Sequence, residues 1–556
     1  MAVDGLSLHV ITNELKDKII NGRIQKSHQP KKDQLIINIY NQKSNYKVLI
    51  NSNAEGYRLH LTEQDFENPY QAPMFCMLLR KHIDGGRLLD VKQPGLERII
   101  EFVIESRDDL GNLINKSLIV ELMGKYSNII LLHTDTRKII DAITRVPFGM
   151  SSVRQVLPGL TYEIPPSNKK DIFDDYEMEI ENPTKDFVKL YEGISPLVAR
   201  ELIHRFETFD KSVNELRNII TNNLFEPSIT FDNRGRVLAG ALKYTHIGNE
   251  YKEFEFMNEA IDNQYEIKVY NKKINSIKNK LASIINNEIK KLKKTIKKQE
   301  KKYRESLKAN EYKRQGDLIK ANLYQIEEGK EKVIVVDYYS EDMPEITIEL
   351  NPKKSPQRNL KEYYKKYEKA IRTQKMTQKY IKKNKNELDY LESILSNIES
   401  SEDLETLEEI KSELIESKYM KDKEKKDNLP NKDKKQESKS EPRSFYIDGF
   451  KIEVGKNNKQ NDYLTLRKAN KEDIWFHTKN IPGSHVVIRN NGQEVSDEVL
   501  LKAANLAAYY SKAKNSSNVP VDYTQIKNVY KQKGSHPGQV FYTDQKTIYI
   551  TPEKPE

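Results

Sequence analysis

The sequence predicts a multidomain α+β protein. The expected order is an N-terminal α+β domain, a helix-hairpin-helix region, a long antiparallel coiled coil with a small β insert at its tip, and a compact C-terminal α/β domain. Strand-like and helix-like apolar patterns alternate at both ends of the chain, and a heptad-like pattern occupies the middle. The 556 residues also allow several domains of ~150 residues each.

Residues 1–175 are predicted to form the N-terminal α+β domain. The stretch LSLHVITNELKDKI places its Leu and Ile residues on one face of a helix. QLIINIY, YKVLINS and YRLHLTE alternate as strands, and APMFCMLLRKHI is helical. RIIEFVIES, SLIVELMG and NIILLHTD are strands again, and the rigid PGLTYEIPP ends the domain.

Residues 176–265 are predicted to form the helix-hairpin-helix region. The helical pattern breaks at Gly193, which supplies a turn, and Ser195 and Pro196 suit the start of the next helix. Exposed amides at such a turn often hold a phosphate. An interdomain helical spacer is the alternative that the residues leave open.

Residues 266–415 are predicted to form a coiled-coil arm, because apolar residues recur in a heptad-like pattern between Lys-rich faces. A β insert is expected at about 331–354, and a second helix from about Ser355 to Ile415. Two long helices around a short insert can fold back antiparallel with the insert at the tip. The density of Lys suggests that parts of the arm lie against phosphate.

The predicted disordered linker, residues 416–443, has almost no apolar side chains and cannot build a core. The compact C-terminal domain, residues 444–556, is expected to consist of strands around a helix at 496–513. It contains the stretch DIWFHTKNIPGSH, which holds the only Trp of the chain.

The composition points to a polyanionic partner. The net charge is +10 and the pI is near 9.0, which favours nucleic acid without proving it. Cys76 is the only cysteine, so a disulfide within the chain and a thiolate metal site are excluded. The sequence shows neither a signal peptide nor a stretch of ~20 apolar residues, so a cytoplasmic location without membrane contact is expected.

Motifs for catalysis and cofactor binding are missing. The chain has no GxxxxGK[ST] loop, no dinucleotide GxGxxG and no GxSxG elbow, so we expect neither a catalytic residue nor a cofactor. His477 and His485 would need further ligands to hold a metal, and Asp473 and His536 are the only candidates in their domain. No metal is therefore expected.

Base stacking suits this stretch better. Trp475 and His477 are two residues apart and share one face of a strand, beside several basic residues. RNA or partner contacts are therefore assigned to Trp475, His477, Lys479 and His485. The alternative is a core Trp in a small sheet, and the sequence leaves open which face of the strand is core.

Glu97 and Arg98 stand side by side in GLERIIEF, at the start of a predicted strand. Adjacent strand residues face opposite ways, so the two do not easily form a catalytic dyad. From the residues alone, they are interpreted as a salt-bridged surface pair.

Several stretches resemble the NFACT family. In chain order they are MAVDGLSL, VELMGKYSNIILLH, ITRVPFGMSSVRQVLPGLTYEIPP, GDLIKANL, NPKKSPQRNLKEYYKKYEKA, DIWFHTKNIPGSHVVI and VPVDYTQIKNVYKQKGSHPGQVFY. The resemblance covers essentially the whole chain, in the family's order of NFACT-N, helix-hairpin-helix, coiled coil with a middle insert, and NFACT-R.

The resemblance implies a ribosome-associated quality-control factor. Such proteins bind large ribosomal subunits obstructed by peptidyl-tRNA. Bacterial members recruit alanyl-tRNA for mRNA-independent addition of Ala to the nascent chain, which marks it for degradation, while the ribosome performs the chemistry. Implied partners are the large subunit, whose stalk base the coiled-coil tip would reach, alanine tRNA, and RqcP, a small RNA-binding protein of the Hsp15 type. No DNA partner is expected.

The resemblance also implies tRNA contacts in the N-terminal domain. The family's tRNA-recruiting pair is Asp-Arg, and Glu97 and Arg98 stand in its place, with the carboxylate about one methylene further from the backbone. The guanidinium of Arg98 suits bidentate contact with phosphate or a base. Glu121 in VELMGK and Arg145 in ITRVPFGM are assigned to the same tRNA surface.

Two other functions are kept as alternatives. One is a surface fibronectin-binding adhesin, which the absent export signal and the Lys-rich arm oppose. The other is an Fpg-like nucleic-acid-processing enzyme, whose nucleophile is an N-terminal Pro where this chain starts Met-Ala.

Overall fold

The computed structural model describes residues 3–108, 110–151, 153–177, 179–233, 235–421 and 440–555. It divides into two compact units, Met1–Asn271 and Lys272–Glu556. Both contain antiparallel sheet and helix, and long helices lie between the sheets in sequence. The predicted class, a multidomain α+β protein, is confirmed.

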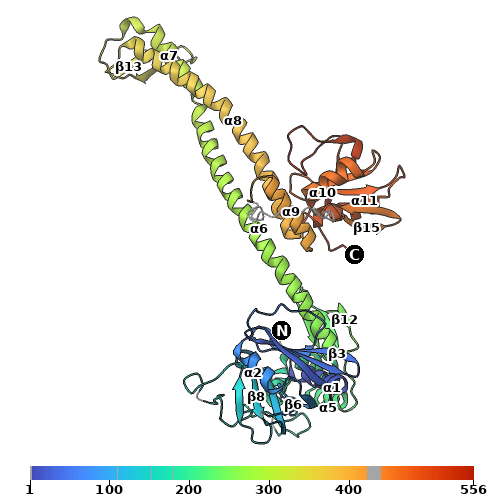
Figure 1. The fold of residues 1–556 in the computed structure, drawn as a ribbon. Helices are drawn as coiled ribbons and strands as arrows, with labels where there is room; N and C mark the ends of the chain where they lie inside the picture. The colour runs from blue at the N-terminus through green and yellow to red at the C-terminus, as the bar shows by residue number, and fades with distance from the viewer. Residues whose placement is uncertain are drawn as a thin grey trace, which may run out of the picture. The chain divides into compact units, whose positions relative to one another are not determined.

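An antiparallel sheet with the strand order β4-β3-β2-β1-β5-β6-β7-β8-β9 forms the centre of the N-terminal unit (Figure 1). Helix α1 (Gly5–Ile19) packs its buried Leu and Ile face against this sheet, as the 3.6-residue period predicts, and α2 (Met74–His82) packs on β1. The strands are β1 (Arg23–Lys31), β2 (Gln34–Asn41), β3 (Ser44–Asn51), β4 (Arg58–Leu61), β5 (Arg87–Lys92), β6 (Ile99–Arg107), β7 (Leu113–Glu121), β8 (Asn128–His133) and β9 (Ile139–Ala142).

The segment that follows is helical, as its apolar pattern predicts. Its helices are α3 (Pro183–Leu190), α4 (Pro196–Phe206) and α5 (Phe209–Thr221). Ser195 caps α4, with its Oγ accepting from the Val198 N–H at 3.3 Å. An antiparallel sheet that the sequence analysis missed comes next, and its short strands are β10 (Ser228–Phe231), β11 (Val237–Gly240) and β12 (Tyr251–Glu253).

Two long helices, α6 (Met257–Ser306) and α8 (Pro356–Ser400), run antiparallel where they pair in the C-terminal unit, and the first turns of α6 belong to the N-terminal unit. The contacts that show this order are Lys278–Glu399, Lys293–Glu392 and Gln299–Asn384. Between the helices in sequence lie α7 (Ala309–Ala321) and the predicted insert, a hairpin of β13 (Lys332–Val336) and β14 (Glu345–Glu349). Figure 1 shows α7 and the hairpin at the end of α8 that lies away from α9.

The second long helix is shorter than predicted. It ends at Ser400 rather than near Ile415, and α9 (Leu404–Glu416) follows after a break. Asp403 caps α9 by accepting from the Thr406 N–H at 2.7 Å. A capping side chain, and not a Gly or Pro, marks this break.

The C-terminal domain is an antiparallel sheet with the order β15-β16-β18-β17-β19-β22, and α11 packs on it, close to the predicted 496–513. The segment before β17 is helical, with α10 followed by a π-helical turn at Leu464–Lys468. The elements are β15 (Arg443–Ile447), β16 (Phe450–Val454), α10 (Asn458–Tyr463), β17 (Ile474–Thr478), β18 (Val486–Arg489), α11 (Asp497–Tyr509), β19 (Val519–Gln525), β20 (Val529–Tyr530), β21 (Phe541–Tyr542) and β22 (Lys546–Ile550).

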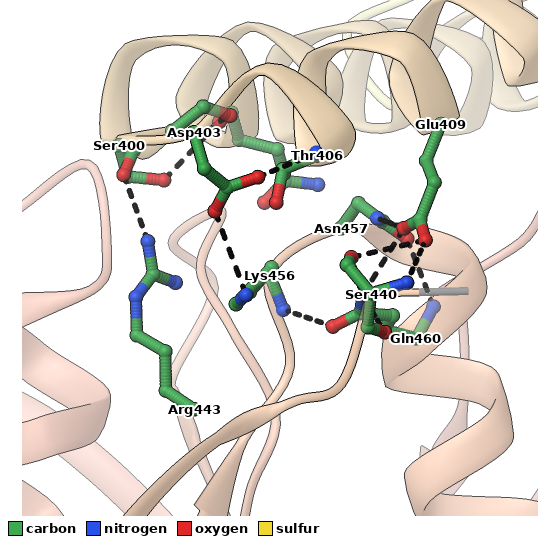
Figure 2. A network of polar contacts seen from close by, with 11 residues as sticks. Ser400, Asp403, Thr406, Glu409, Ser440, Arg443, Lys456, Asn457 and Gln460 are labelled. Atoms are coloured by element: carbon green, nitrogen blue, oxygen red, sulfur yellow. Dashed lines mark hydrogen bonds and ion pairs between the residues drawn. The ribbon is translucent and has the colours of Figure 1, made fainter. Parts of the chain in front are cut away.

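A polar network joins α9 to the start of this domain (Figure 2). The Glu409 carboxylate accepts from the Ser440 N–H at 2.7 Å, from Asn457 Nδ2 at 2.5 Å and from Gln460 Nε2 at 3.1 Å. Further contacts in the network are Lys456–Asp403 and Arg443–Ser400. Charged and polar groups thus supply the contacts of Glu409, and close by the Tyr390 ring of α8 stacks on His536 with centroids 4.3 Å apart.

The predicted disordered linker, residues 416–443, corresponds only partly to described structure. Residues 422–439 lie outside the described residues. At the other end, Ser440 is buried and Arg443 begins β15, so the last residues assigned to the linker belong to the folded domain.

Candidate functional site

Glu97 and Arg98 lie in the loop between β5 and β6, immediately before β6 begins at Ile99. The alternation of a regular strand does not apply to this loop, and both residues line one cavity of about 410 Å³. Among the other residues that line it are Asp4, Tyr57, Met123, Lys169 and Ser195. The prediction that adjacent residues face opposite ways concerns a strand and does not apply to this loop, where the pair borders one cavity.

The guanidinium of Arg98 is half-buried and makes few contacts. Its Nη1 donates to the hydroxyl of Tyr57 at 3.3 Å, and its backbone carbonyl accepts from the Leu122 N–H at 2.8 Å. Within the described part of the chain, no carboxylate lies within 4.0 Å of this guanidinium, so Glu97 and Arg98 are not an ion pair. The interpretation as a salt-bridged pair is wrong, and most of the Arg98 donors can reach a ligand.

Two charged residues from far along the chain lie near Glu97 and Arg98. Lys169 Nζ donates to the Val188 carbonyl at 2.6 Å, and burial, followed by the charge of Arg98, lowers the pKa of Lys169. Burial, and then the neighbouring carboxylates of Glu97 and Asp171, raise the pKa of Glu192 to about 7. The sequence analysis missed Lys169 and Glu192, and the only nearby signal was the turn that begins one residue after Glu192.

Glu121 does not face the cavity. Its side chain is 0% exposed and accepts from Arg154 Nη1 at 2.7 Å, from Arg154 Nη2 at 2.6 Å and from the Tyr162 hydroxyl at 2.9 Å. The assignment of Glu121 to the tRNA surface is therefore wrong. Its carboxylate instead ties the loop between Arg145 and Tyr162 to the end of β7.

Arg145 lies at the same end of the sheet as Arg98. That end is shared by the starts of β6 and β8 and the ends of β7 and β9, as their pairing shows. The Arg145 side chain is 53% exposed, and its Nε and Nη2 each donate to Asp141 at 2.8 Å. Its remaining donors face solvent.

In the C-terminal domain, Trp475 is a core residue. Its indole is 0% exposed and packs with Leu464, Val487, Ile526 and Val529. The hypothesis that a base stacks on Trp475 is wrong, because the π-helical turn and β20 cover the face of β17 that could have carried it. The core alternative is the one that the structure shows.

The two histidines also belong to this interior. His485 is 1% exposed, with Thr465 Oγ1 2.7 Å from its Nδ1 and the Gly538 carbonyl 3.1 Å from its Nε2, so its assignment as a contact residue is wrong. His477 is half-buried and stacks on Trp475 with ring centroids 5.8 Å apart. Burial lowers the pKa of His477 to about 4, and that of His485 well below its ordinary value.

Lys479 is half-exposed, with its Nζ 3.6 Å from the buried carboxylate of Asp522. Over the described ranges of the chain, no three His, Cys, Asp or Glu side chains are grouped so as to hold a metal. No helix in those ranges is long and apolar enough to cross a membrane.

The fold and the site define a class of protein that combines a charged cavity in an N-terminal α+β domain, an antiparallel pair of long helices and a compact C-terminal domain. The chain belongs to the NFACT family. The family's NFACT N-terminal and middle domains match residues 4–436, and the NFACT protein RNA binding domain matches residues 444–544.

Relatives match over the full length. The Rqc2 homolog RqcH of Bacillus subtilis (strain 168) is 39% identical, covering 100% of this chain and 98% of the relative. The Rqc2 homolog RqcH of Streptococcus suis (strain 05ZYH33) is 34% identical, covering 99% and 98%. A solved N-terminal structure of the fibronectin/fibrinogen-binding protein from Streptococcus suis is 30% identical, covers 47% of this chain and 98% of its own, and has a TM-score of 0.43.

Proposed function

We propose that the chain is a ribosome-associated quality-control factor. It binds large ribosomal subunits obstructed by peptidyl-tRNA and recruits alanyl-tRNA for mRNA-independent Ala tailing of the nascent chain, which marks that chain for degradation. The observation that carries this proposal is the match over the full length to relatives named Rqc2 homolog RqcH. The ribosome forms the peptide bonds, and this protein acts in the cytoplasm as an adaptor.

In the N-terminal unit, Arg98 contacts the tRNA. Its guanidinium borders a cavity, has a neutral hydroxyl as its side-chain partner, and offers the paired donors that phosphate and base edges accept. Glu97 supplies an acceptor in the same cavity. Arg145, exposed at the same end of the sheet, extends the surface along the RNA backbone.

In the C-terminal domain, RNA contacts Tyr463 and Arg467 rather than Trp475. Tyr463 is 50% exposed at the end of α10, and the exposed Arg467 lies four residues later on the continuing helical turn. Residues at this spacing lie on one helical face. A stacking ring beside a cation suits single-stranded RNA without sequence preference.

The β13–β14 hairpin contacts the stalk base of the large subunit. Tyr338 and Tyr339 are exposed there with ring centroids 4.8 Å apart, and Met343 is exposed beside them in sequence. Exposed aromatic and Met side chains are enriched where proteins bind one another. RqcP of the Hsp15 type is the further partner.

The test is recovery of the tagged chain from cells, followed by sequencing of the bound tRNA and sedimentation of the ribosomal fractions. We expect enrichment of alanine tRNA and co-sedimentation with free large subunits. Arg98→Ala should bind tRNA about tenfold more weakly and keep its fold. Arg107→Ala is the matched control, since Arg107 is exposed at the other end of β6. Equal tRNA recovery from both variants would refute the role of Arg98.

A further inference from the structure

The loop that carries Glu97 and Arg98 is packed between two other backbone segments. Gly5 begins α1 and Gly193 precedes α4, and a Cβ on either would lie 1.9 Å from the carbonyl oxygen of Leu96. The Gly5 N–H also donates to the Gly193 carbonyl at 2.9 Å. Because three backbones meet here without intervening side chains, α1 and the helical region fix the path of the loop.

Glu192 is the side chain that reaches this loop from the helical region. Its Oε1 accepts from the Leu96 N–H at 3.2 Å, and a Cβ on Gly95 would lie 1.8 Å from the same oxygen. Gly95 has a φ of +49°, a conformation that favours glycine. The Glu192 carboxyl therefore lies against the backbone just before Glu97, and the neighbouring Glu97 carboxyl helps to raise its pKa.

The charged groups that face Glu192 are the carboxyls of Glu97 and Asp171 and the ammonium of Lys169. With a pKa of about 7, Glu192 carries a proton in much of the population at neutral pH. A protonated Glu192 carboxyl has an O–H to offer the Glu97 carboxylate, while Oε1 accepts from Leu96. Loss of the proton leaves two neighbouring carboxylates, which repel each other.

We propose that Glu192 is a positioning residue for RNA binding: it holds the loop and the Glu97 side chain so that Glu97 and Arg98 face a single RNA ligand together. This inference rests on the proposed function of Arg98 and adds that the helical region controls the site. It also assigns the stronger binding state to the protonated form of Glu192.

The experiment uses the full chain and a fluorescently labelled alanine tRNA, with binding measured from pH 5.5 to pH 8. Hydrogen exchange of peptides that span residues 93–98 is measured in parallel, without RNA. The variants are Glu192→Ala, Glu192→Gln and Arg98→Ala. Glu177→Gln is the charge-matched control, because Glu177 is exposed on the segment before α3.

Glu192→Ala should raise exchange in the loop and weaken tRNA binding about fivefold, since one charge-assisted contact is lost. Glu192→Gln keeps a donor and an acceptor, so it should bind like the protonated wild type and lose the wild-type decline toward pH 8. Glu177→Gln should change neither property.

Unchanged loop exchange in Glu192→Ala would overturn the inference, and so would a Glu192→Gln pH profile equal to the wild type. The proposed function fails separately, if Arg98→Ala binds tRNA as well as the wild type does. In that case loop exchange still decides whether Glu192 positions the loop.

Discussion

The loop before β6 and the strand β17 are the two regions in which the sequence indicates RNA contact, and they use their side chains in opposite ways. The loop directs Glu97 and Arg98 into a cavity, whereas β17 directs Trp475 into a core. β17 lies between β18 and β19, with α11 on one side and a helical turn on the other. A side chain of a type that binds RNA can reach a ligand only where no other element of the fold covers it.

Trp475→Ala should have the largest effect and sharpen this comparison. Removing a buried indole leaves a cavity, and we expect the C-terminal unit to lose about 3–5 kcal/mol of unfolding free energy, measured by denaturant unfolding. Tyr446→Ala is the control, because Tyr446 is exposed on β15. A stable Trp475→Ala variant that loses RNA binding would contradict the core role.

Glu121→Ala tests the reassignment of a predicted tRNA contact. It leaves Arg154 and Tyr162 without their buried partner, so we expect a loss of about 3 kcal/mol in thermal or chemical unfolding. Glu163→Ala, at an exposed neighbouring position, should stay within about 0.5 kcal/mol of the wild type. If Glu121→Ala had normal stability but bound tRNA poorly, the original assignment of Glu121 as a tRNA contact would be supported.

Acid should destabilise the region around β17. The folded-state pKa values of His477 and His485 lie below the ordinary value near 6.5, so their contribution is present above pH 6.5 and is lost as pH falls toward 4. His477 alone should cost the C-terminal unit about 2 kcal/mol between pH 7 and pH 5, and His485 should add to this loss. Intrinsic Trp fluorescence follows this unit alone, because Trp475 is the only Trp. Equal stability at both pH values would contradict the buried placement.

Arg98→Ala should weaken tRNA binding about tenfold, with no change in unfolding free energy, because its guanidinium has one hydroxyl partner in the described structure. Binding titrations at two salt concentrations measure the effect. Arg107→Ala provides the matched control. A fall in stability as large as the fall in binding would show that Arg98 belongs to the fold rather than to the ligand.

Tyr463→Ala should have the smallest effect, about a threefold loss of RNA binding by the chain, from the loss of one stacking surface. Tyr549→Ala removes another exposed tyrosine, on β22, and should leave binding unchanged. Equal losses of RNA binding in Tyr463→Ala and Tyr549→Ala would contradict a specific RNA contact at Tyr463.

The sequence predicts much of the fold, because local patterns govern local elements. The apolar face of α1, the strands around it and the Ser195 cap follow from period and capping. The short strands β10–β12 carry too few residues for a clear period, and the break after Ser400 lacks a Gly or Pro signal.

The site is less predictable than the fold. Glu97 and Arg98 are adjacent in sequence, and the family resemblance points to them, but Lys169 and Glu192 approach the same loop from the segments around α3. Only the packing of Gly5, Leu96 and Gly193 brings these segments together. Burial of Glu121 and His485 likewise depends on partners distant in sequence.

The junction around Glu409 has a consequence for the behaviour of the protein in a crowded solution. An interface made of hydrogen bonds can separate without exposing apolar surface, because water can replace the lost hydrogen-bond partners. The apolar residues of α9, among them Leu407 and Ile410, pack instead with α6 and α8. Water can therefore replace the partners of Glu409 while the apolar residues of α9 stay packed on α6 and α8.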